Sequence, residues 1–306
     1  MTQPQSRFRC ADAARERADP LAGSAPRTGR WLLLEHPGPW AIDAVAGAGI
    51  EPSVLNRLNV AAHQAKARIL LIRRHGRRNL RAERRWTVTG LDQATVRGTW
   101  QYDDDLLAAA DALISDPEPG AGHTEPIVLV CTHGVHDTCC ALRGRPVAAA
   151  LARRWPELVW ECSHTGGDRF APNVLVLPDG FYYGNLDAEL AVGTIERHFA
   201  GDVATEYLRG MTRYSPPVQA AVIATYERCR PLGPSEISVR AVEQTGPHEG
   251  PGSETIVQLE VPALKAAFRV EILSVRRREA QLTCRAVRDT PATEYQLRRY
   301  DRIGDR

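Results

Sequence analysis

The sequence lacks the features of an exported or membrane-inserted protein. No apolar run approaches the roughly 20 residues that a transmembrane helix needs. The N-terminal stretch MTQPQSRFRCADAARERADP contains no apolar segment of the kind found in signal peptides. The net charge of +2 is small and gives no indication of nucleic-acid binding. We therefore expect a cytoplasmic protein without a membrane or nucleic-acid partner.

Other absences narrow the chemistry. The sequence has no C-x-x-C pair for thiol–disulfide exchange and no G-x-G-x-x-G phosphate loop. Its seven cysteines are an odd number in a chain without an export signal, so a disulfide framework is not expected. What remains is an ordinary globular composition, 43% hydrophobic and 25% charged, over 306 residues. That length allows two compact units or one large one.

The order of hydrophobic and turn-forming segments divides the chain into four parts. The first part is polar and rich in Pro, Ala and Arg, and the last combines helical segments with a small antiparallel sheet. The stretch SDPEPGAGH reads as a linker because of its prolines, glycines and acids. The predicted units are a loose tail (1–27), an α/β segment (28–115), a compact domain (124–202) and a β-rich appendage (203–306).

Individual elements of the outer parts follow from the same patterns. Strands are predicted at 30–37 and 68–74 and in RWTVTG and TVRGTWQY, and helices at 106–114 and, as a pair divided near Pro52, at 41–67. Towards the C-terminus, VATEYLRG and PVQAAVIATYERC are predicted helical. Strand candidates there are EISVRAVE, TIVQLEV, FRVEIL, QLTCRAV and EYQLRRY.

The middle of the chain has the order β-α-β-β-β-α. A buried strand ends at Cys131, and a helix with Asp137 as N-cap and a break near Pro146 follows. The next elements are a strand at 158–164, a hairpin with an Asp-Gly turn at 173–186 and a helix at 187–199. This order matches a thioredoxin-like domain, in which the first two strands end side by side. The N-terminal α/β segment could be a degenerate second copy of that fold.

Four of the seven cysteines fall close together in this domain, at positions 131, 139, 140 and 162. Cys140 lies in the first turn of the predicted helix, where unpaired N–H groups and the helix dipole favour the thiolate. Only one of the adjacent Cys139 and Cys140 can point into a site at the strand end, and Cys139 is expected to pack. The scattered Cys10, Cys229 and Cys284 are expected to be structural or incidental.

The fold would bring Cys131 next to the loop that carries Cys162, His164 and two adjacent glycines. Two cysteines from the first loop and Cys or His donors from the second would make four metal ligands. His133 and His136 lie within reach and are alternative ligands. The separation between Cys131 and Cys140 is atypical for zinc, whereas two thiolates at a helix N-terminus suit an iron–sulfur cluster.

The motifs CTHGVHDTCC, SHTGGDRFAPN and LVLPDGFYYG resemble those of the sucrase/ferredoxin-like family, a group of thioredoxin-like ferredoxins. The resemblance covers roughly Pro126 to Asn185, and WLLLEHPGPW is similar to the family's opening strand. It implies a 2Fe-2S cluster held by two cysteines and by the histidines of an H-x-G-G-H loop. In this sequence the second histidine of that loop is replaced by Asp168.

Because thiolates hold iron–sulfur clusters better than carboxylates, we expect Cys162 to replace that histidine. The predicted ligands are therefore Cys131, Cys140, Cys162 and His164. Asp168 is the alternative fourth ligand. Otherwise it would cap a turn, pair with Arg169, or accept a hydrogen bond from His164.

The function expected from these residues is electron transfer by one 2Fe-2S cluster, with no enzymatic activity implied. The alternatives are a zinc-stabilised binding domain and a cofactor-free thiol oxidoreductase that uses Cys131 or Cys140. Sugar hydrolysis is not expected, because no pair of carboxylates stands out as a glycosidase needs. The basic stretch Arg73–Arg85 is either a solvated loop or a docking patch for an acidic redox partner.

Overall fold

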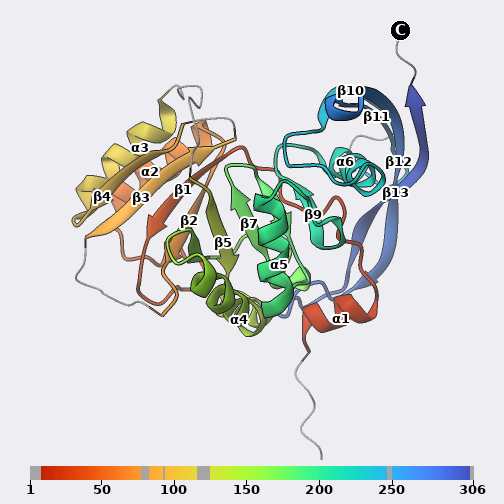
Figure 1. The fold of residues 1–306 in the computed structure, drawn as a ribbon. Coiled ribbons are helices and arrows are strands. Elements are labelled where there is room, and N and C mark those ends of the chain that lie inside the picture. Colours follow the sequence, from red (N-terminus) through yellow and green to blue (C-terminus); the bar gives the residue numbers. More distant parts are fainter. Residues whose placement is uncertain (1–7, 77–82, 92–93, 116–124, 247–249, 304–306) are drawn as a thin grey trace, which may run out of the picture.

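A computed structural model describes residues 8–76, 83–91, 94–115, 125–246 and 250–303. The chain is a mixed α/β protein with two sheets (Figure 1). The larger sheet has nine strands in the order β4-β3-β1-β2-β6-β5-β7-β8-β9, and a separate C-terminal sheet has four, β10-β11-β12-β13. This confirms the predicted fold class with its β-rich C-terminal part.

The central part of the large sheet has the thioredoxin-like order of elements that the sequence predicts. β5 pairs in parallel with β6 and antiparallel with β7, which pairs antiparallel with β8. The bounds are β5 Ile127–Cys131, α4 Thr138–Arg154, β6 Val159–Cys162, β7 Val174–Leu177, β8 Phe181–Tyr183 and α5 Ala188–Phe199. All residues of these four strands are buried, as expected for strands covered on both faces.

Helix α4 begins as predicted, because the Asp137 side chain accepts a hydrogen bond from the Cys139 N–H. The predicted break at Pro146 is wrong, since α4 continues through this residue to Arg154. A proline removes the hydrogen bond to the carbonyl four residues earlier. Here that carbonyl belongs to Leu142, an exposed residue, so water can satisfy it.

The N-terminal half repeats the same topology. β1 pairs in parallel with β2 and antiparallel with β3, and β3 pairs antiparallel with β4. The bounds are β1 Arg30–Glu35, α2 Pro52–Gln64, β2 Ala67–Arg73, β3 Arg84–Gly90, β4 Val96–Trp100, η1 Asp103–Leu106 and α3 Leu107–Ile114. When the strands of each half are numbered from 1 in chain order, both halves have the order 2-1-3-4 across the sheet. The predicted linker between them falls, apart from Ser115, outside the described residues.

The two halves join edge to edge through their second strands. β2 pairs antiparallel with β6, with Ile72 opposite Cys162 and Arg73 opposite Glu161. The buried Glu161 carboxylate accepts hydrogen bonds from Arg73 Nε at 2.9 Å and Thr132 Oγ1 at 3.0 Å, and lies 2.8 Å from His75 Nδ1. A charge network therefore ties the two halves beside the end of β5.

Two N-terminal predictions are corrected. Residues 41–51 form turns and bends, so only the second of the two predicted helices exists. Glycines at 47 and 49, the latter with φ of +74°, favour turns in this stretch. The loose-tail prediction is wrong for α1 (Cys10–Glu16), whose small residues Cys10, Ala11 and Ala14 are buried against the rest of the molecule.

The C-terminal part also departs from prediction. VATEYLRG forms η3 (Thr205–Tyr207) and β9 (Leu208–Met211) in place of a helix, and β9 extends the large sheet beside β8. The remaining elements are η2 Asp168–Phe170, α6 Pro216–Arg228, β10 Ser238–Thr245, β11 Glu254–Val261, η4 Pro262–Leu264, β12 Ala266–Ala280 and β13 Thr290–Ile303. Helix α6 confirms the second predicted helix.

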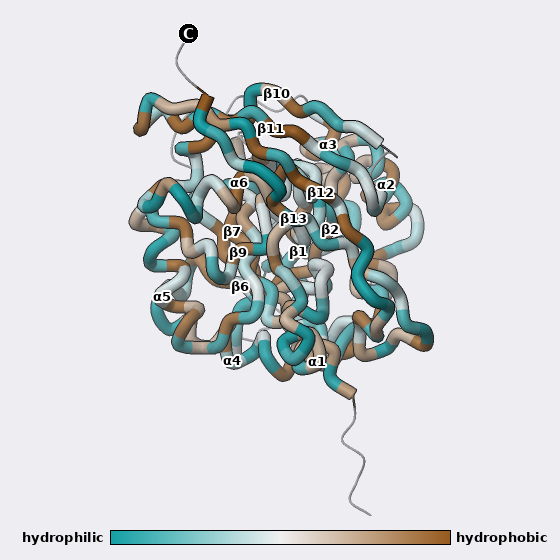
Figure 2. Tube along the Cα trace, turned by 90° about the vertical axis from the view of Figure 1, so that its right-hand side faces the viewer, coloured by the Kyte–Doolittle hydropathy of each residue, from teal (hydrophilic) through white to brown (hydrophobic). Residues whose placement is uncertain are grey.

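The C-terminal sheet packs its inner face on α6 (Figure 1). Hydrophobic and hydrophilic residues alternate along β11 and β12 (Figure 2), which leaves one face for the core and one for solvent. The predicted strand QLTCRAV is wrong, because residues 281–289 form the loop between β12 and β13. Among the helices that the structure describes, none has the length and apolar composition needed to cross a bilayer.

Candidate metal centre

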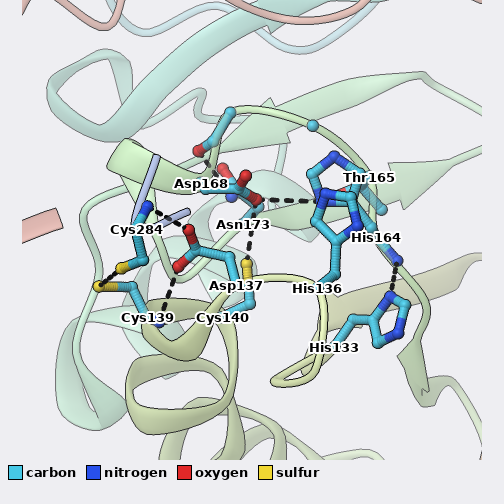
Figure 3. A network of polar contacts seen from close by, with 12 residues as sticks. His133, His136, Asp137, Cys139, Cys140, His164, Thr165, Asp168, Asn173 and Cys284 are labelled. Carbon is cyan, nitrogen blue, oxygen red and sulfur yellow. Dashed lines mark hydrogen bonds and ion pairs between the residues drawn. The ribbon is translucent and has the colours of Figure 1, made fainter. Parts of the chain in front are cut away.

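Three of the four donors predicted from sequence converge where β5 and β6 end; Figure 3 shows two of them, Cys140 and His164. Cys131 is the last residue of β5, Cys140 lies in the first turn of α4, and His164 follows β6. Their ligand atoms all lie within 4.8 Å of one another. Both thiols are fully buried, while His164 is partly exposed. The parallel pairing of β5 and β6 produces this contact between residues far apart in sequence.

Asp168, the first residue of η2, joins the same array. Its Oδ1 lies 3.0 Å from His164 Nδ1 and 3.3 Å from Cys140 Sγ. His136, His164 and Asp168 form a second group of donors within 4.8 Å of one another. The site is therefore an elongated set of donors, made of two overlapping groups that share His164.

Cys162 occupies a different position. Its backbone lies opposite Cys131 in the parallel pair, and its side chain is fully buried. Within the described residues it belongs to neither donor group. Burial raises the pKa of the Cys162 thiol well above its usual value. Cys162 as fourth ligand stays a prediction, and the geometry brings Asp168 closer to the other donors.

The electrostatics of the site favour an ionised Cys131 and Asp168 beside a protonated His164. Hydrogen bonding between the two thiols lowers the pKa of Cys131 well below its usual value and raises that of Cys140. Burial alone would lower the pKa of His164, but Asp168 and Cys131 outweigh it and raise the pKa to about 9. Burial opposes ionisation of Asp168, yet the neighbouring His164 lowers its pKa. A metal that binds His164 would therefore have to displace the proton that Asp168 stabilises on this ring.

One buried atom of this site lacks a hydrogen bond. His164 Nδ1 is buried, and although it lies close to Asp168 it is not aligned to donate to any described group. An imidazole nitrogen beside two thiols is nevertheless a common metal donor. Two soft sulfurs with an imidazole also form a donor set that iron–sulfur centres use. The residues present thus fit a bound 2Fe-2S cluster.

His133 contacts the backbone of the loop that carries His164. Its Nδ1 accepts a hydrogen bond from the His164 backbone N–H at 3.3 Å, and its Nε2 donates to the Ala41 carbonyl at 2.7 Å. Both ring nitrogens of the neutral imidazole are therefore used. Burial lowers the pKa of His133 and so favours this neutral form. These contacts position the backbone of His164, and ligation by His133 stays an alternative prediction.

His136 covers the exposed side of His164. The two rings stack with centroids 3.7 Å apart and an angle of 23° between their planes. An open pocket of about 340 Å³ lies beside them, lined in part by His133, His136, His164 and Arg68. One edge of the candidate centre therefore reaches a solvent-accessible surface.

The loop between His164 and Asp168 is shaped by glycines and by one buried arginine. Gly166 and Gly167 adopt φ of +94° and +81°. Arg209 of β9 donates to the Gly166 carbonyl at 3.0 Å and to Asn173 Oδ1 at 2.6 Å. A Cβ on Gly167 would overlap the Arg209 guanidinium. No sequence motif singles out Arg209, so this contact could not be predicted.

Comparison with known proteins identifies a family that matches this chain. The family described as sucrase/ferredoxin-like matches residues 21–210, which is more than half of the chain. The chain belongs to the sucrase/ferredoxin-like family. The match spans both repeats of the large sheet and the candidate centre, and so confirms the resemblance seen in the motifs. A search of curated proteins found no match.

Two solved structures are similar to part of this sucrase/ferredoxin-like chain. Both are cysteine-to-serine variants of the thioredoxin-like 2Fe-2S ferredoxin from Aquifex aeolicus, at 22% identity. Each match covers 28% of this chain and 97% of the ferredoxin, with TM-scores of 0.24 and 0.25.

A second group of thiols lies on the other side of the first turn of α4 in this family member (Figure 3). Cys139 Sγ is 3.4 Å from Cys284 Sγ, which is 3.5 Å from Cys10 Sγ. Cys10 and Cys284, scattered in the sequence, thus lie together beside Cys139. Their separation of 274 residues in sequence explains why no spacing rule could connect them.

The proposed docking patch is only partly within the described residues, since 77–82 lie outside them. At its ends, three arginines pack on aromatic rings of this family member. The guanidinium carbons of Arg73, Arg74 and Arg84 lie 4.0, 3.5 and 3.2 Å from the ring centroids of Trp40, Trp160 and Trp100. These side chains contribute to packing, and docking of a partner here stays a prediction.

Proposed function

We propose that this chain is an electron carrier that binds one 2Fe-2S cluster at the end of β5. The observation that carries the proposal is the buried Cys131–Cys140 pair with the His164 imidazole within 4.8 Å of both sulfurs. Membership of the sucrase/ferredoxin-like family supports it. When bound, such a cluster accepts and releases single electrons.

The protein's own groups would set the properties of the centre. Cys131 and Cys140 supply thiolates, and the N-terminus of α4 stabilises the negative charge that these sulfurs carry. His164 supplies a neutral donor, which raises the reduction potential relative to four thiolates. Burial of the two cysteines keeps water away from the sulfur side of the site.

The histidine side would face the redox partner. His164 is partly exposed, stacks on His136 and borders the open pocket. Electron exchange needs a short path to the surface, and this edge is the nearest exposed part of the donor array. We propose that a partner protein docks over His136 and His164.

The simplest test is the visible spectrum of anaerobically purified protein. We expect a red-brown protein with two irons and two acid-labile sulfides per chain, whose visible absorption bleaches on reduction. Cys131→Ser and Cys140→Ser should each lose this absorption, whereas Cys229→Ser, remote from the site, should retain it. A colourless protein with zinc bound by Cys131 and Cys140 would contradict the proposal and favour the zinc-domain alternative.

We further propose that the fourth ligand is Asp168, on the basis of its distance to His164 and Cys140. Asp168→Ala should then lose most of the iron, while Asp168→His should retain the cluster at a changed reduction potential. Cys162→Ser is the matched test of the original prediction. Loss of iron in Cys162→Ser with retention in Asp168→Ala would reverse the assignment.

A further inference from the structure

The second thiol group has the composition and compactness of a metal site. Cys10, Cys139, Cys284 and Asp137 place one donor atom each within 4.8 Å of every other. The first site divides into two overlapping groups, but these four donors form a single group. A single group suits one ion, because a cluster distributes its terminal ligands over several irons.

The donor distances come within about 0.4 Å of those around tetrahedral zinc. With Zn–S bonds of about 2.3 Å, two thiolates on one tetrahedral zinc lie about 3.8 Å apart, and a thiolate and a carboxylate oxygen about 3.5 Å apart. The sulfur–sulfur distances here are 3.4 and 3.5 Å, and Cys10 Sγ lies 3.6 Å from both oxygens of Asp137. A disulfide would need about 2.0 Å and would leave the third thiol unpaired.

The buried carboxylate of Asp137 also favours a bound cation. This carboxylate is 1% exposed and accepts hydrogen bonds from the N–H groups of Cys139 and Cys284, at 2.9 and 2.7 Å. In the part of the chain that the structure describes, no basic side chain pairs with it. A buried carboxylate without a counter-charge is costly, and a divalent cation among the thiols would supply one.

We propose that Cys10, Cys139, Cys284 and Asp137 bind one zinc ion. Binding would release the thiol protons to solvent and leave three thiolates and one carboxylate around Zn²⁺. The Cys10 backbone N–H, 3.5 Å from Cys284 Sγ, would stabilise one of these thiolates. Cys284 is half-buried, which gives the ion a path to the site.

The ion would join three parts of the chain. Cys10 begins α1, Cys139 lies in the first turn of α4, and Cys284 lies in the loop between β12 and β13. Because Cys139 and Cys140 are consecutive, the zinc would fix the same helical turn that carries a ligand of the candidate 2Fe-2S centre. The inference of a zinc site does not depend on that centre being loaded.

The test is the metal content of the full chain. We expect about one zinc per chain, lost in Cys10→Ser and Cys284→Ser and kept in Cys229→Ser, another half-buried cysteine. Cys131→Ser should lose iron but keep zinc. The iron and zinc contents therefore test the electron-carrier proposal and the zinc-site proposal independently. Zinc absent from wild type after incubation with Zn²⁺, or lost in Cys131→Ser, would overturn the assignment.

A measurement on the unaltered chain covers the case in which these variants do not fold. Alkylation with N-ethylmaleimide, followed by peptide mass spectrometry, should leave Cys284 protected until a chelator removes the zinc. Cys229 should react to the same extent before and after the chelator. Equal reactivity of Cys284 in both samples, or a disulfide between Cys139 and Cys284, would refute the zinc site.

Discussion

At the scale of single residues, the candidate centre depends on side chains that are not among its proposed ligands. Arg209 holds the carbonyl of Gly166 and occupies the space where a side chain at Gly167 would be. His133 holds the backbone of His164. These contacts fix the direction of the second loop, so their loss should reduce cluster loading without removing a ligand.

We expect Gly167→Ala to be more damaging than another glycine substitution at positive φ. Strain at φ of +81° costs about 1–3 kcal/mol, and the new methyl group would also displace Arg209. Gly201→Ala is the control, because its φ is +78° and its Cβ meets no atom within 4 Å. Chemical unfolding and iron content measure both effects. Equal losses in the two variants would show that the Arg209 contact does not matter.

Sequence spacing predicted this site in part. Cys131, Cys140 and His164 follow from the order of strands, because parallel neighbours end at the same edge. The roles of Arg209, Cys10 and Cys284 do not follow from it. They depend on β9, α1 and the loop after β12 folding back onto the central domain, and those contacts join residues without a shared motif.

At the scale of elements, the junction between β2 and β6 is the feature on which both halves depend. Few residues pair there, and Glu161 concentrates charge at the contact by binding Arg73, His75 and Thr132. Removal of one member leaves a buried charge without its partner. The junction includes Cys162 and lies beside the end of β5.

Glu161→Gln should therefore lower the free energy of unfolding by about 3–5 kcal/mol, since Arg73 would remain buried without its counter-ion. Glu196→Gln removes the partner of Arg154 in an exposed ion pair and should cost less than about 1 kcal/mol. Urea unfolding of both variants measures the difference. Similar small effects would mean that strand pairing alone holds the halves together.

Local patterns predicted most elements of the large sheet and α6. Of the two main failures, one has a local cause and the other arises from strand pairing between distant segments. The stretch 41–51 has helical composition, but its glycines and Asp43 favour turns. VATEYLRG contributes to β9 because pairing with β8 outweighs its weak helical preference. The periodicity of the sequence gives no information about such pairing.

At the scale of the whole molecule, continuity of the nine-stranded sheet implies shared stability. The centres of β1 and β5, Leu32–Leu34 and Val128–Val130, are completely buried in one sheet. Their amides should exchange hydrogen only by global unfolding, with free energies of opening equal to within about 1 kcal/mol. Native-state exchange measures this, with the more exposed β10 expected to exchange faster. Earlier exchange in β1 would show that the halves open separately.

The repeated topology also affects which substitutions the sequence of this protein can accept. In a symmetric dimer every substitution occurs twice, and each surface at the interface meets its own copy. Here both halves lie in one chain, so their shared edge can place an arginine of one half opposite a glutamate of the other. Mutations in the N-terminal half leave the cysteines of the second half untouched. The sequence of the N-terminal repeat can therefore change while the second repeat keeps the candidate metal donors.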